Sequence, residues 1–371
     1  MKITKVEAFP VSIPTKLYRD AYGEYADYRA VIVKVVTDEK VVGWGESHAK
    51  YHEIYGETLE SVTGIIKNQL APALVGEDPF RIERIHDLMD AVIGRAPCAK
   101  TGLDLAVYDI MGLTSGRPVY NLLGGKVREK VPIAIEIGIN APKVMADEAA
   151  HWVERGLRVV KIKAGSGDFE MDMARIKAVR DAVGDKVSLR VDPNTHWSVD
   201  ESKRAGRYLS QINFEYLEQP VPAWNIDGMA EIRAQAGIKV EADEGAWTVY
   251  DVVEHGRRKA ADVINLKIPK VGGLMKGKKM AAVADAFGMA CMAGAEGEFA
   301  GGLSAKAHLA VSTRNALYAS DFTEISKMQA WILTEPMEMD KSGCVEVPDG
   351  PGLGVTIDED ALTKYTVKLA F

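Results

Sequence analysis

Cysteine is scarce in this sequence of 371 residues. The three cysteines, Cys98, Cys291 and Cys344, lie far apart and form no Cys-x-x-Cys motif. A disulfide-stapled extracellular scaffold needs an even, closely spaced set of cysteines. The scarcity therefore argues against such a scaffold and favours a reducing, cytoplasmic setting.

Long apolar runs and basic clusters are missing as well. No uncharged apolar stretch approaches the ~18 residues of a membrane-spanning helix, and the charged segment 1–7 does not have the apolar core of a signal peptide. The 46 Lys and Arg against 53 Asp and Glu leave a net charge of −7 without a basic block. We therefore expect neither a membrane nor a nucleic acid as a partner.

Residues 1–125 predict an antiparallel sheet followed by helices. Residues 3–8 alternate between apolar and polar side chains, and residues 30–36 are rich in β-branched residues. Residues 41–46 follow a turn and are expected to pair with 30–36 as a hairpin. Helical patterns then occupy 58–69, 79–93 and 100–114. The segment is therefore interpreted as an α+β domain.

From residue 126 onward, short apolar strands alternate with helical patterns. The eight expected strands are 131–137, 159–163, 188–192, 216–218, 238–243, 263–267, 290–294 and 317–321. Eight such units predict a (β/α)8-type barrel over 126–340. The alternative is a doubly wound open sheet, but its glycine-rich phosphate loop does not follow the first strand. The tail, 341–371, is expected to leave the barrel and pack elsewhere.

Charged residues end five successive predicted barrel strands. They are Lys163, Asp192, Glu218, Asp243 and Lys267, and each step along the chain is 24 to 29 residues, about one βα unit. Side chains at the carboxyl ends of barrel strands face the active site. We therefore expect these five side chains to meet at one level of the barrel.

The order of these five residues predicts a metal site between two lysines. The carboxylates of Asp192, Glu218 and Asp243 would repel one another unless a cation lies among them. Oxygen ligands without His or Cys suit Mg²⁺, with Mn²⁺ as the alternative, and argue against zinc. Lys163 and Lys267 flank the site, and a partly desolvated lysine beside a cation should have a lowered pKa and act as a general base. Together they can remove a proton from one face of a carbon and return it on the other, while the metal stabilises the enolate.

The chain resembles the enolase superfamily, in its muconate lactonizing enzyme subgroup, over nearly its whole length. The similar segments are AKTGLDLA at 99–106 with LLGG at 122–125, VDPN at 191–194, and NLK at 265–267 followed by GGL at 272–274. The resemblance implies a (β/α)7β TIM-like barrel with an α+β capping domain formed from the N-terminal segment and the C-terminal tail. It also implies a homo-oligomer.

The resemblance further implies roles for particular residues. Asp192, Glu218 and Asp243 match the metal ligands, and Lys163 and Lys267 match the acid/base lysines of a superfamily whose sites pair such bases with Mg²⁺. The residues that match supporting positions near the ligands are Lys161 and Asn194. Two cap loops, at about 18–25 and 47–55, are expected to close over the barrel mouth.

Two features separate this sequence from other members of the superfamily. Strand six carries Lys267 and no His lies in 290–298, so a mandelate-racemase-like His–Asp dyad is not expected. The segment that begins at Asp321 and ends at Thr323 keeps half of the Asp-x-Asp pair with which dipeptide epimerases hold an ammonium group. This difference argues against dipeptide substrates.

Glu241 is an unexpected acidic residue in the fifth predicted barrel strand. By alternation it shares a face with Asp243, one layer deeper, and a buried carboxylate needs a partner. We predict that it pairs with Lys161 or Arg190. A slip of the strand register is the alternative.

Several further residues are candidates for substrate contact. Tyr18, Tyr22, Tyr25 and Tyr28 suggest an aromatic lid that binds a cationic group, with ordinary interface packing as the alternative. The candidate substrate-binding residues are Tyr22, Tyr55, Glu298 and Asp321. Their acidic members favour an amino-acid-like substrate with a positive or hydrogen-bonding nitrogen.

The sequence therefore predicts a Mg²⁺-dependent isomerase that abstracts the α-proton of a small-molecule carboxylate. Racemisation or epimerisation of an amino acid derivative by two opposed lysines is the main prediction. Muconate-type cycloisomerisation and β-elimination from a hydroxy acid or hydroxyproline use the same catalytic residues and remain open. A barrel that binds carboxylates without catalysis is the alternative from another class.

Overall fold

The computed structural model describes residues 1–369, and its N-terminal part is an antiparallel sheet covered by helices. Strands β1 (Ile3–Arg19), β2 (Glu24–Thr37) and β3 (Val42–His48) pair in that order, as the predicted hairpin requires. The helices that follow are α1 (His52–Tyr55), α2 (Leu59–Ile65), the π-helix η1 (Ile66–Leu70), α3 (Ala71–Leu74), α4 (Ile82–Val92), α5 (Pro97–Ser115) and α6 (Val119–Leu122).

Helix α5 lies directly on β3 because glycine removes the side chains between them. A Cβ atom on Gly45 would lie 1.9 Å from the carbonyl oxygen of Gly102 in α5. Any larger residue at position 45 would therefore push the helix off the sheet.

The second part of the chain is a nearly closed parallel barrel of eight strands. These are β4 (Lys130–Ile137), β5 (Val159–Lys163), β6 (Ser188–Asp192), β7 (Phe214–Glu218), β8 (Val240–Ala242), β9 (Val263–Asn265), β10 (Ala290–Met292) and β11 (Ser320–Asp321), in the order β10-β9-β8-β7-β6-β5-β4-β11. A bridge between Cys291 and Ala316 closes the gap between the last two strands.

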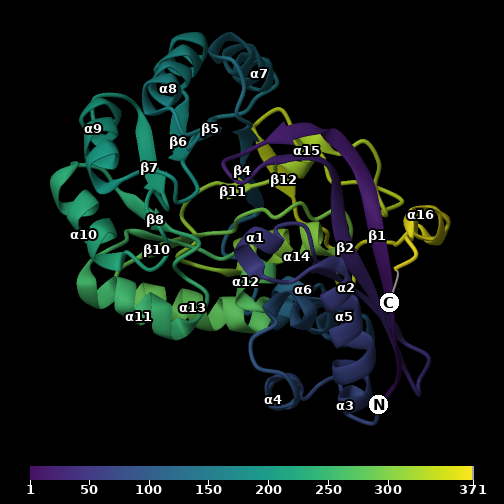
Figure 1. Cartoon of the computed structure of the whole chain (residues 1–371). Coiled ribbons are helices and arrows are strands. Elements are labelled where there is room, and N and C mark those ends of the chain that lie inside the picture. The colour runs from purple at the N-terminus through teal and green to yellow at the C-terminus, as the bar shows by residue number, and fades with distance from the viewer. Residues whose placement is uncertain (370–371) are drawn as a thin grey trace.

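The barrel helices surround these strands on the outside (Figure 1). They are α7 (Pro142–Glu154), α8 (Phe169–Val183), α9 (Val199–Leu209), α10 (Ile226–Gln235), α11 (Val249–Arg258), α12 (Ile268–Val271), α13 (Leu274–Ala286) and α14 (Gly301–Ser312). Between β11 and the next strand along the chain, the described residues contain one helix, the four-residue α15 (Glu324–Lys327). The arrangement is seven βα units and a final strand, which confirms the predicted (β/α)7β barrel with an α+β cap.

The C-terminal tail contacts both parts of the molecule. Strand β12 (Cys344–Glu346) pairs antiparallel with β4, and helix α16 (Glu359–Tyr365) is followed by a bridge from Thr366 to Val11 in β1. Figure 1 shows this yellow segment beside the purple cap sheet. The division of the chain into 1–125, 126–340 and 341–371 stays a prediction.

Apolar packing joins the cap to the barrel mouth. Val11, Ile13 and Ile32 of the cap sheet form one buried cluster with Phe299 and Ala300, which lie just before α14. This cluster holds the tip of the β1–β2 hairpin over the carboxyl ends of the barrel strands, so cap side chains can reach the site.

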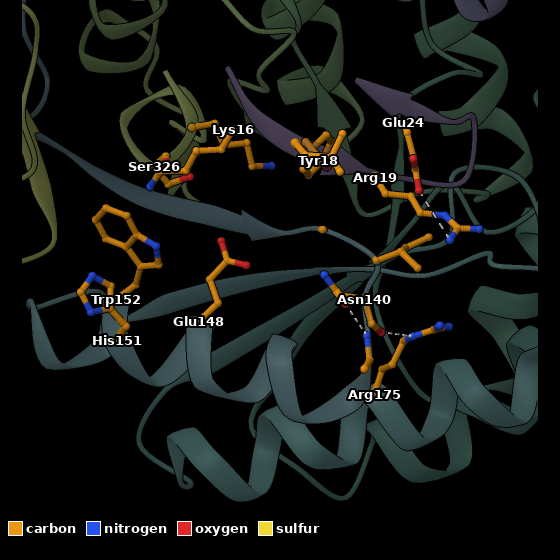
Figure 2. Close-up of a pocket in the computed structure, with 15 residues that line it drawn as sticks. Lys16, Tyr18, Arg19, Glu24, Asn140, Glu148, His151, Trp152, Arg175 and Ser326 are labelled. Atoms are coloured by element: carbon orange, nitrogen blue, oxygen red, sulfur yellow. Dashed lines mark hydrogen bonds and ion pairs between the residues drawn. The ribbon is translucent and has the colours of Figure 1, made fainter. Parts of the chain in front are cut away.

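A cavity of about 490 Å³ opens where this hairpin meets β4, α7 and α15 (Figure 2). Tyr18 and Lys327 lie on its wall, as do Asn140 and Glu148. Among the helices of residues 1–369, none is long and apolar enough to cross a membrane.

Candidate functional site

The lysines and carboxylates at the ends of the barrel strands meet in ion pairs. On β5, Lys163 Nζ lies 2.7 Å from Asp192 Oδ2 and donates to Asn194 Oδ1 at 3.0 Å. Across the barrel, Lys267 Nζ lies 2.6 Å from Asp243 Oδ2. Lys163 pairs with Asp192 because the register of β5 and β6 sets the two residues side by side.

Lys161 lies one layer deeper in the barrel, and its ammonium group contacts several carboxylates at once. Its Nζ lies 2.7 Å from Glu218 Oε2, 2.9 Å from Asp321 Oδ2 and 3.1 Å from Glu136 Oε1. Lys161 therefore lies in contact with the predicted metal ligand Glu218. Asp321 forms ion pairs with Lys161 and with Arg190, whose Nη1 lies 3.5 Å from Asp321 Oδ1. These two contacts hold its side chain inside the barrel.

The pKa values of the two flanking lysines are shifted in the direction opposite to the expectation. Burial alone would lower them, but Asp192 and Glu136 raise the pKa of Lys163 above its ordinary value. Asp243 and Glu296 do the same for Lys267. In this arrangement both side chains are ammonium groups, because each one faces two carboxylates.

The oxygen atoms among these lysines fit a hard divalent cation. Among residues 1–369, no three His, Cys, Asp or Glu side chains stand as a ready-made metal-binding group. Within this described part of the chain, Glu244 Oε2 is nevertheless a buried oxygen without a hydrogen-bond partner, and Asp243 Oδ2 contacts Lys267 without hydrogen-bond alignment. Spare carboxylate oxygens without nitrogen or sulfur donors fit Mg²⁺ better than zinc.

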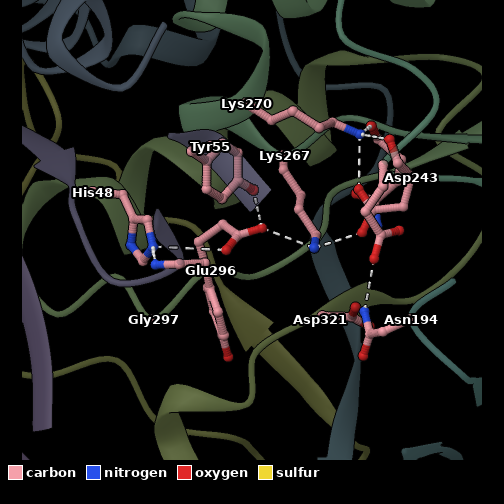
Figure 3. A network of polar contacts seen from close by, with 12 residues as sticks. His48, Tyr55, Asn194, Asp243, Lys267, Lys270, Glu296, Gly297 and Asp321 are labelled. Atoms are coloured by element: carbon pink, nitrogen blue, oxygen red, sulfur yellow. Dashed lines mark hydrogen bonds and ion pairs between the residues drawn. The ribbon is translucent and has the colours of Figure 1, made fainter. Parts of the chain in front are cut away.

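Besides Glu136, two further acidic residues of this site were not predicted from the sequence. Glu244 accepts hydrogen bonds from Tyr22 Oη and Asn194 Nδ2, both at 3.0 Å. Glu296 Oε1 lies 2.8 Å from Lys267 Nζ and accepts a hydrogen bond from Tyr55 Oη (Figure 3). Glu244 directly follows the predicted ligand Asp243, and Glu296 lies two positions before the predicted residue Glu298. This closeness in the sequence was the signal that could have pointed to both residues.

Glu296 also connects the cap to the barrel. His48 Nε2, at the end of β3, lies 3.7 Å from Glu296 Oε2, and the ring of Tyr55 packs edge-on against Trp247 at 5.2 Å. The predicted residue Glu298, by contrast, pairs with Lys306 at 3.1 Å. It is therefore Glu296 that reaches Lys267.

The tyrosine cluster of the cap exists, but the cation that it surrounds belongs to this chain. The ammonium of Lys50 lies 3.9 Å from the ring centroid of Tyr28, 4.1 Å from Tyr51, 4.2 Å from Tyr25 and 5.3 Å from Tyr18. It also donates a hydrogen bond of 2.6 Å to Tyr51 Oη. Of the predicted lid, Tyr18, Tyr25 and Tyr28 therefore surround Lys50 and not a substrate cation, so that interpretation is wrong for these three tyrosines. Tyr22 lies outside this cluster and donates to Glu244.

The predicted partners of Glu241 are engaged elsewhere. Neither carboxylate oxygen of this fully buried residue has a hydrogen-bond partner within the described part of the chain. Lys161 turns to Glu218, and Arg190 Nε lies 2.7 Å from Glu215 Oε2. The predicted pairing is therefore wrong. Burial raises the pKa of Glu241 to about 8, which makes it a neutral acid at neutral pH.

Replacing Lys50 with methionine is expected to stabilise the protein at pH 7. Burial lowers the pKa of Lys50 to about 7 from 10.5; Asp20 opposes this shift and Lys327 adds to it. Below pH 7 the lysine is charged in the folded and the unfolded chain, so the folded state bears the full cost of the buried charge. As the pH rises from 7 towards 10.5, the folded chain loses this proton before the unfolded chain does. The free-energy cost of the buried charge therefore falls, and the free energy of unfolding of the wild type rises.

We expect Lys50→Met to raise the free energy of unfolding at pH 7 by about 2 kcal/mol, since lost cation–π contacts offset part of the gain. Thermal unfolding at pH 7 and pH 10 should show this advantage shrinking at the higher pH. The exposed Lys143, replaced in the same way, should change stability little at either pH. A Lys50→Met protein less stable than the wild type at pH 7 would contradict the prediction.

Comparison with known proteins covers nearly the whole chain. Residues 3–124 match the family described as Mandelate racemase / muconate lactonizing enzyme, N-terminal domain, and residues 144–361 match the one described as Enolase C-terminal domain-like. The N-succinyl-L-Arg/Lys racemase of Bacillus cereus is 36% identical over 99% of this chain and 98% of that protein. Its crystal structure superimposes with a TM-score of 0.93 over 99% of both chains.

Two further relatives carry other activities in their names. The hydrophobic dipeptide epimerase of Enterococcus faecalis is 34% identical over 96% of this chain and all of that protein. Muconate cycloisomerase 1 of Rhodococcus opacus is 30% identical over 99% of both chains.

Proposed function

Because the chain belongs to the mandelate racemase/muconate lactonizing enzyme family of the enolase superfamily and is an isomerase, we propose that it racemises or epimerises an N-acylated amino acid. Lys163 and Lys267 would exchange the α-proton. The observation that supports this proposal is their placement. Lys163 ends β5 and Lys267 follows β9, with β6, β7 and β8 between them, so a carbon bound at the centre has one ammonium group on each side.

Asp192, Glu218 and Asp243 would hold the divalent cation that the family implies, which we take to be Mg²⁺. Its charge would stabilise the negative charge that develops on the substrate carboxylate as the α-proton leaves. With those carboxylates engaged, Lys163 and Lys267 would each lose one of the two carboxylate contacts that raise their pKa values, with Glu136 and Glu296 remaining, and would become better proton acceptors.

The remaining residues of the site position these groups. Asn194 holds the Nζ of Lys163, and Glu296 holds the Nζ of Lys267, at 3.0 Å and 2.8 Å. Tyr22 and Tyr55 reach from the cap to Glu244 and Glu296 and so cover the barrel mouth. Covering the site excludes water from the carbanion that forms during turnover.

Two observations favour an N-acyl amino acid over a dipeptide. Asp321 is already held by Lys161 and Arg190, so it is not free to bind the ammonium group of a dipeptide. In addition, the Bacillus cereus relative, at 36% identity, is named for racemisation of N-succinylated amino acids. Cycloisomerisation of a muconate-like diacid is the alternative, supported by the Rhodococcus relative. Assembly into a homo-oligomer stays a prediction.

Deuterium uptake at Cα in D₂O with Mg²⁺ tests the proposal directly. We expect N-acyl amino acids to gain one deuterium and to yield both enantiomers, as read by mass spectrometry and chiral chromatography, while dipeptides exchange at least tenfold more slowly. Lactonisation of a muconate without exchange into any N-acyl amino acid would support the cycloisomerase instead.

A further inference from the structure

Glu136, a buried carboxylate of β4, lies beside both lysines of β5. Its Oε1 atom lies 3.1 Å from Lys161 Nζ and 3.7 Å from Lys163 Nζ. The strand register places it there, because Glu136 pairs with Lys161 across β4 and β5. Lys163 comes two positions after Lys161, so both side chains leave the strand on the same face. One carboxylate oxygen therefore lies between two ammonium groups that would otherwise repel each other.

A second carboxylate bridges the same two lysines, but it belongs to the proposed metal site. Asp192 Oδ2 lies 2.7 Å from Lys163 Nζ and 3.3 Å from Lys161 Nζ. An oxygen that binds a divalent cation is no longer available to two ammonium groups. Among residues 1–369, Asp192 and Glu136 are the carboxylates at ion-pair distance from Lys163. Once Asp192 serves the cation, Glu136 is the carboxylate that continues to hold Lys163.

The lysine on the opposite side of the site has a second partner of the same kind. Lys267 Nζ lies 2.6 Å from Asp243, a proposed metal ligand, and 2.8 Å from Glu296, which lies outside the proposed ligand set. Glu296 in turn accepts a hydrogen bond from Tyr55 Oη of the cap (Figure 3). Lys267 is thus held by a carboxylate that a cap tyrosine fixes in place.

A different cap tyrosine fixes Glu136 in the corresponding way. Tyr18, in β1, donates a hydrogen bond of 2.9 Å from its Oη to Glu136 Oε2. Two neighbours confine its buried ring, since a Cβ atom on Gly138 would lie 2.8 Å from a ring carbon and Lys327 Nζ lies 3.0 Å from the ring centroid. The missing side chain at position 138 therefore lets the ring lie against the end of β4. A ring confined in this way keeps its hydroxyl, and hence the Glu136 carboxylate, in one position.

We propose that Glu136 is a positioning residue that holds the ammonium group of Lys163 towards the substrate, and that Tyr18 acts through Glu136. The inference rests on the proposed function and deepens it, because each face of the α-carbon then has a lysine with a supporting carboxylate of its own. These carboxylates are Glu136 for Lys163 and Glu296 for Lys267. Since the two supports are separate, loss of Glu136 disturbs proton transfer on one face of the substrate and leaves the other face intact.

Deuterium exchange of each pure enantiomer of an N-acyl amino acid separates this role from a general structural one. The enantiomer that Lys163 serves is the one whose exchange Lys163→Ala abolishes. We expect Glu136→Gln to lower kcat for exchange of that enantiomer by about 10- to 100-fold at an unchanged KM, because the substitution disturbs the placement of the base and not substrate binding. Exchange of the opposite enantiomer should keep its wild-type rate. Tyr18→Phe should show the same asymmetry with a smaller loss.

Two further variants provide the controls. Glu136→Asp keeps the charge and should recover part of the exchange that Glu136→Gln loses. Glu148→Gln removes a half-buried carboxylate that lines the cavity of Figure 2 together with Tyr18, and it should exchange both enantiomers as the wild type does. Where Glu136→Gln does not fold, Tyr18→Phe leaves every charge in place and carries the test. An equal loss for both enantiomers, no loss for either, or a loss confined to the opposite enantiomer would overturn the proposal.

Crystal structures of the wild type and the variants with bound Mg²⁺ give a reading that does not depend on turnover. We expect Lys163 Nζ to contact Glu136 in the wild type and to turn away from that position in Glu136→Gln. A Lys163 side chain that keeps its position in the variant would overturn the proposal. A displaced Lys163 in a protein whose wild type exchanges no N-acyl amino acid would support the positioning role and reject the racemase. Exchange of both enantiomers without the asymmetry would do the reverse.

Discussion

Racemisation is expected to fall by about 10³-fold when either Lys163 or Lys267 is replaced with alanine, within the 10²–10⁴-fold range of a general acid or base. The two lysines lie on opposite sides of the site, so each would face the α-proton of one enantiomer. Lys163→Ala should abolish deuterium exchange of one enantiomer and Lys267→Ala that of the other. Exchange of each pure enantiomer in D₂O, followed by mass spectrometry, measures this directly.

Chemical rescue provides the control for this experiment. Methylamine can occupy the space left by the lysine side chain and should restore part of the lost exchange in each alanine variant. Each substitution also removes one of the two ion pairs of a buried carboxylate, since Asp192 keeps Lys161 and Asp243 keeps Lys270, so unfolding should be measured in parallel. If both enantiomers lose exchange equally in one variant and neither does in the other, a single base acts and the two-lysine mechanism is wrong.

Removal of divalent cations is expected to abolish activity without unfolding the protein. The carboxylates of Asp192, Glu218 and Asp243 each contact a lysine ammonium, so they remain neutralised when no cation is bound. The chemistry, in contrast, depends on stabilisation of charge on the substrate, to which a metal ion contributes several kcal/mol. A chelator should lower turnover by about 10³-fold or more, and added Mg²⁺ should restore it, with circular dichroism unchanged.

Substitutions of the metal ligands sharpen this prediction. Glu218→Gln should raise the Mg²⁺ concentration needed for half-maximal activity by at least about tenfold, because one anionic ligand is lost. Glu57→Gln is the matched control, since Glu57 is a buried carboxylate that binds the backbone N–H groups of Cys98 and Ala99 in the cap. Full activity in the presence of a chelator would contradict the proposed metal site.

The barrel and its central residues could be predicted from the sequence for a simple reason. Each βα unit returns the chain to the same edge of the sheet, so residues one unit apart, such as Lys163 and Asp192, must lie side by side. The structure places them 2.7 Å apart. The alternation along β8 likewise predicted that Glu241 is buried. These inferences depend on backbone periodicity alone.

The partners of buried charges depended on tertiary structure. Lys50 belongs to the cap and Lys327 follows the last barrel strand, and only the packing of the hairpin on the barrel mouth brings both to Tyr18. Glu296 reaches Lys267 instead of Glu298, because Glu298 is drawn to Lys306. The sequence alone determined which strand ends carry charge. Which charges pair, and which remain unpaired, was decided by contacts between segments far apart in the chain, since electrostatic attraction acts through space and not along the backbone.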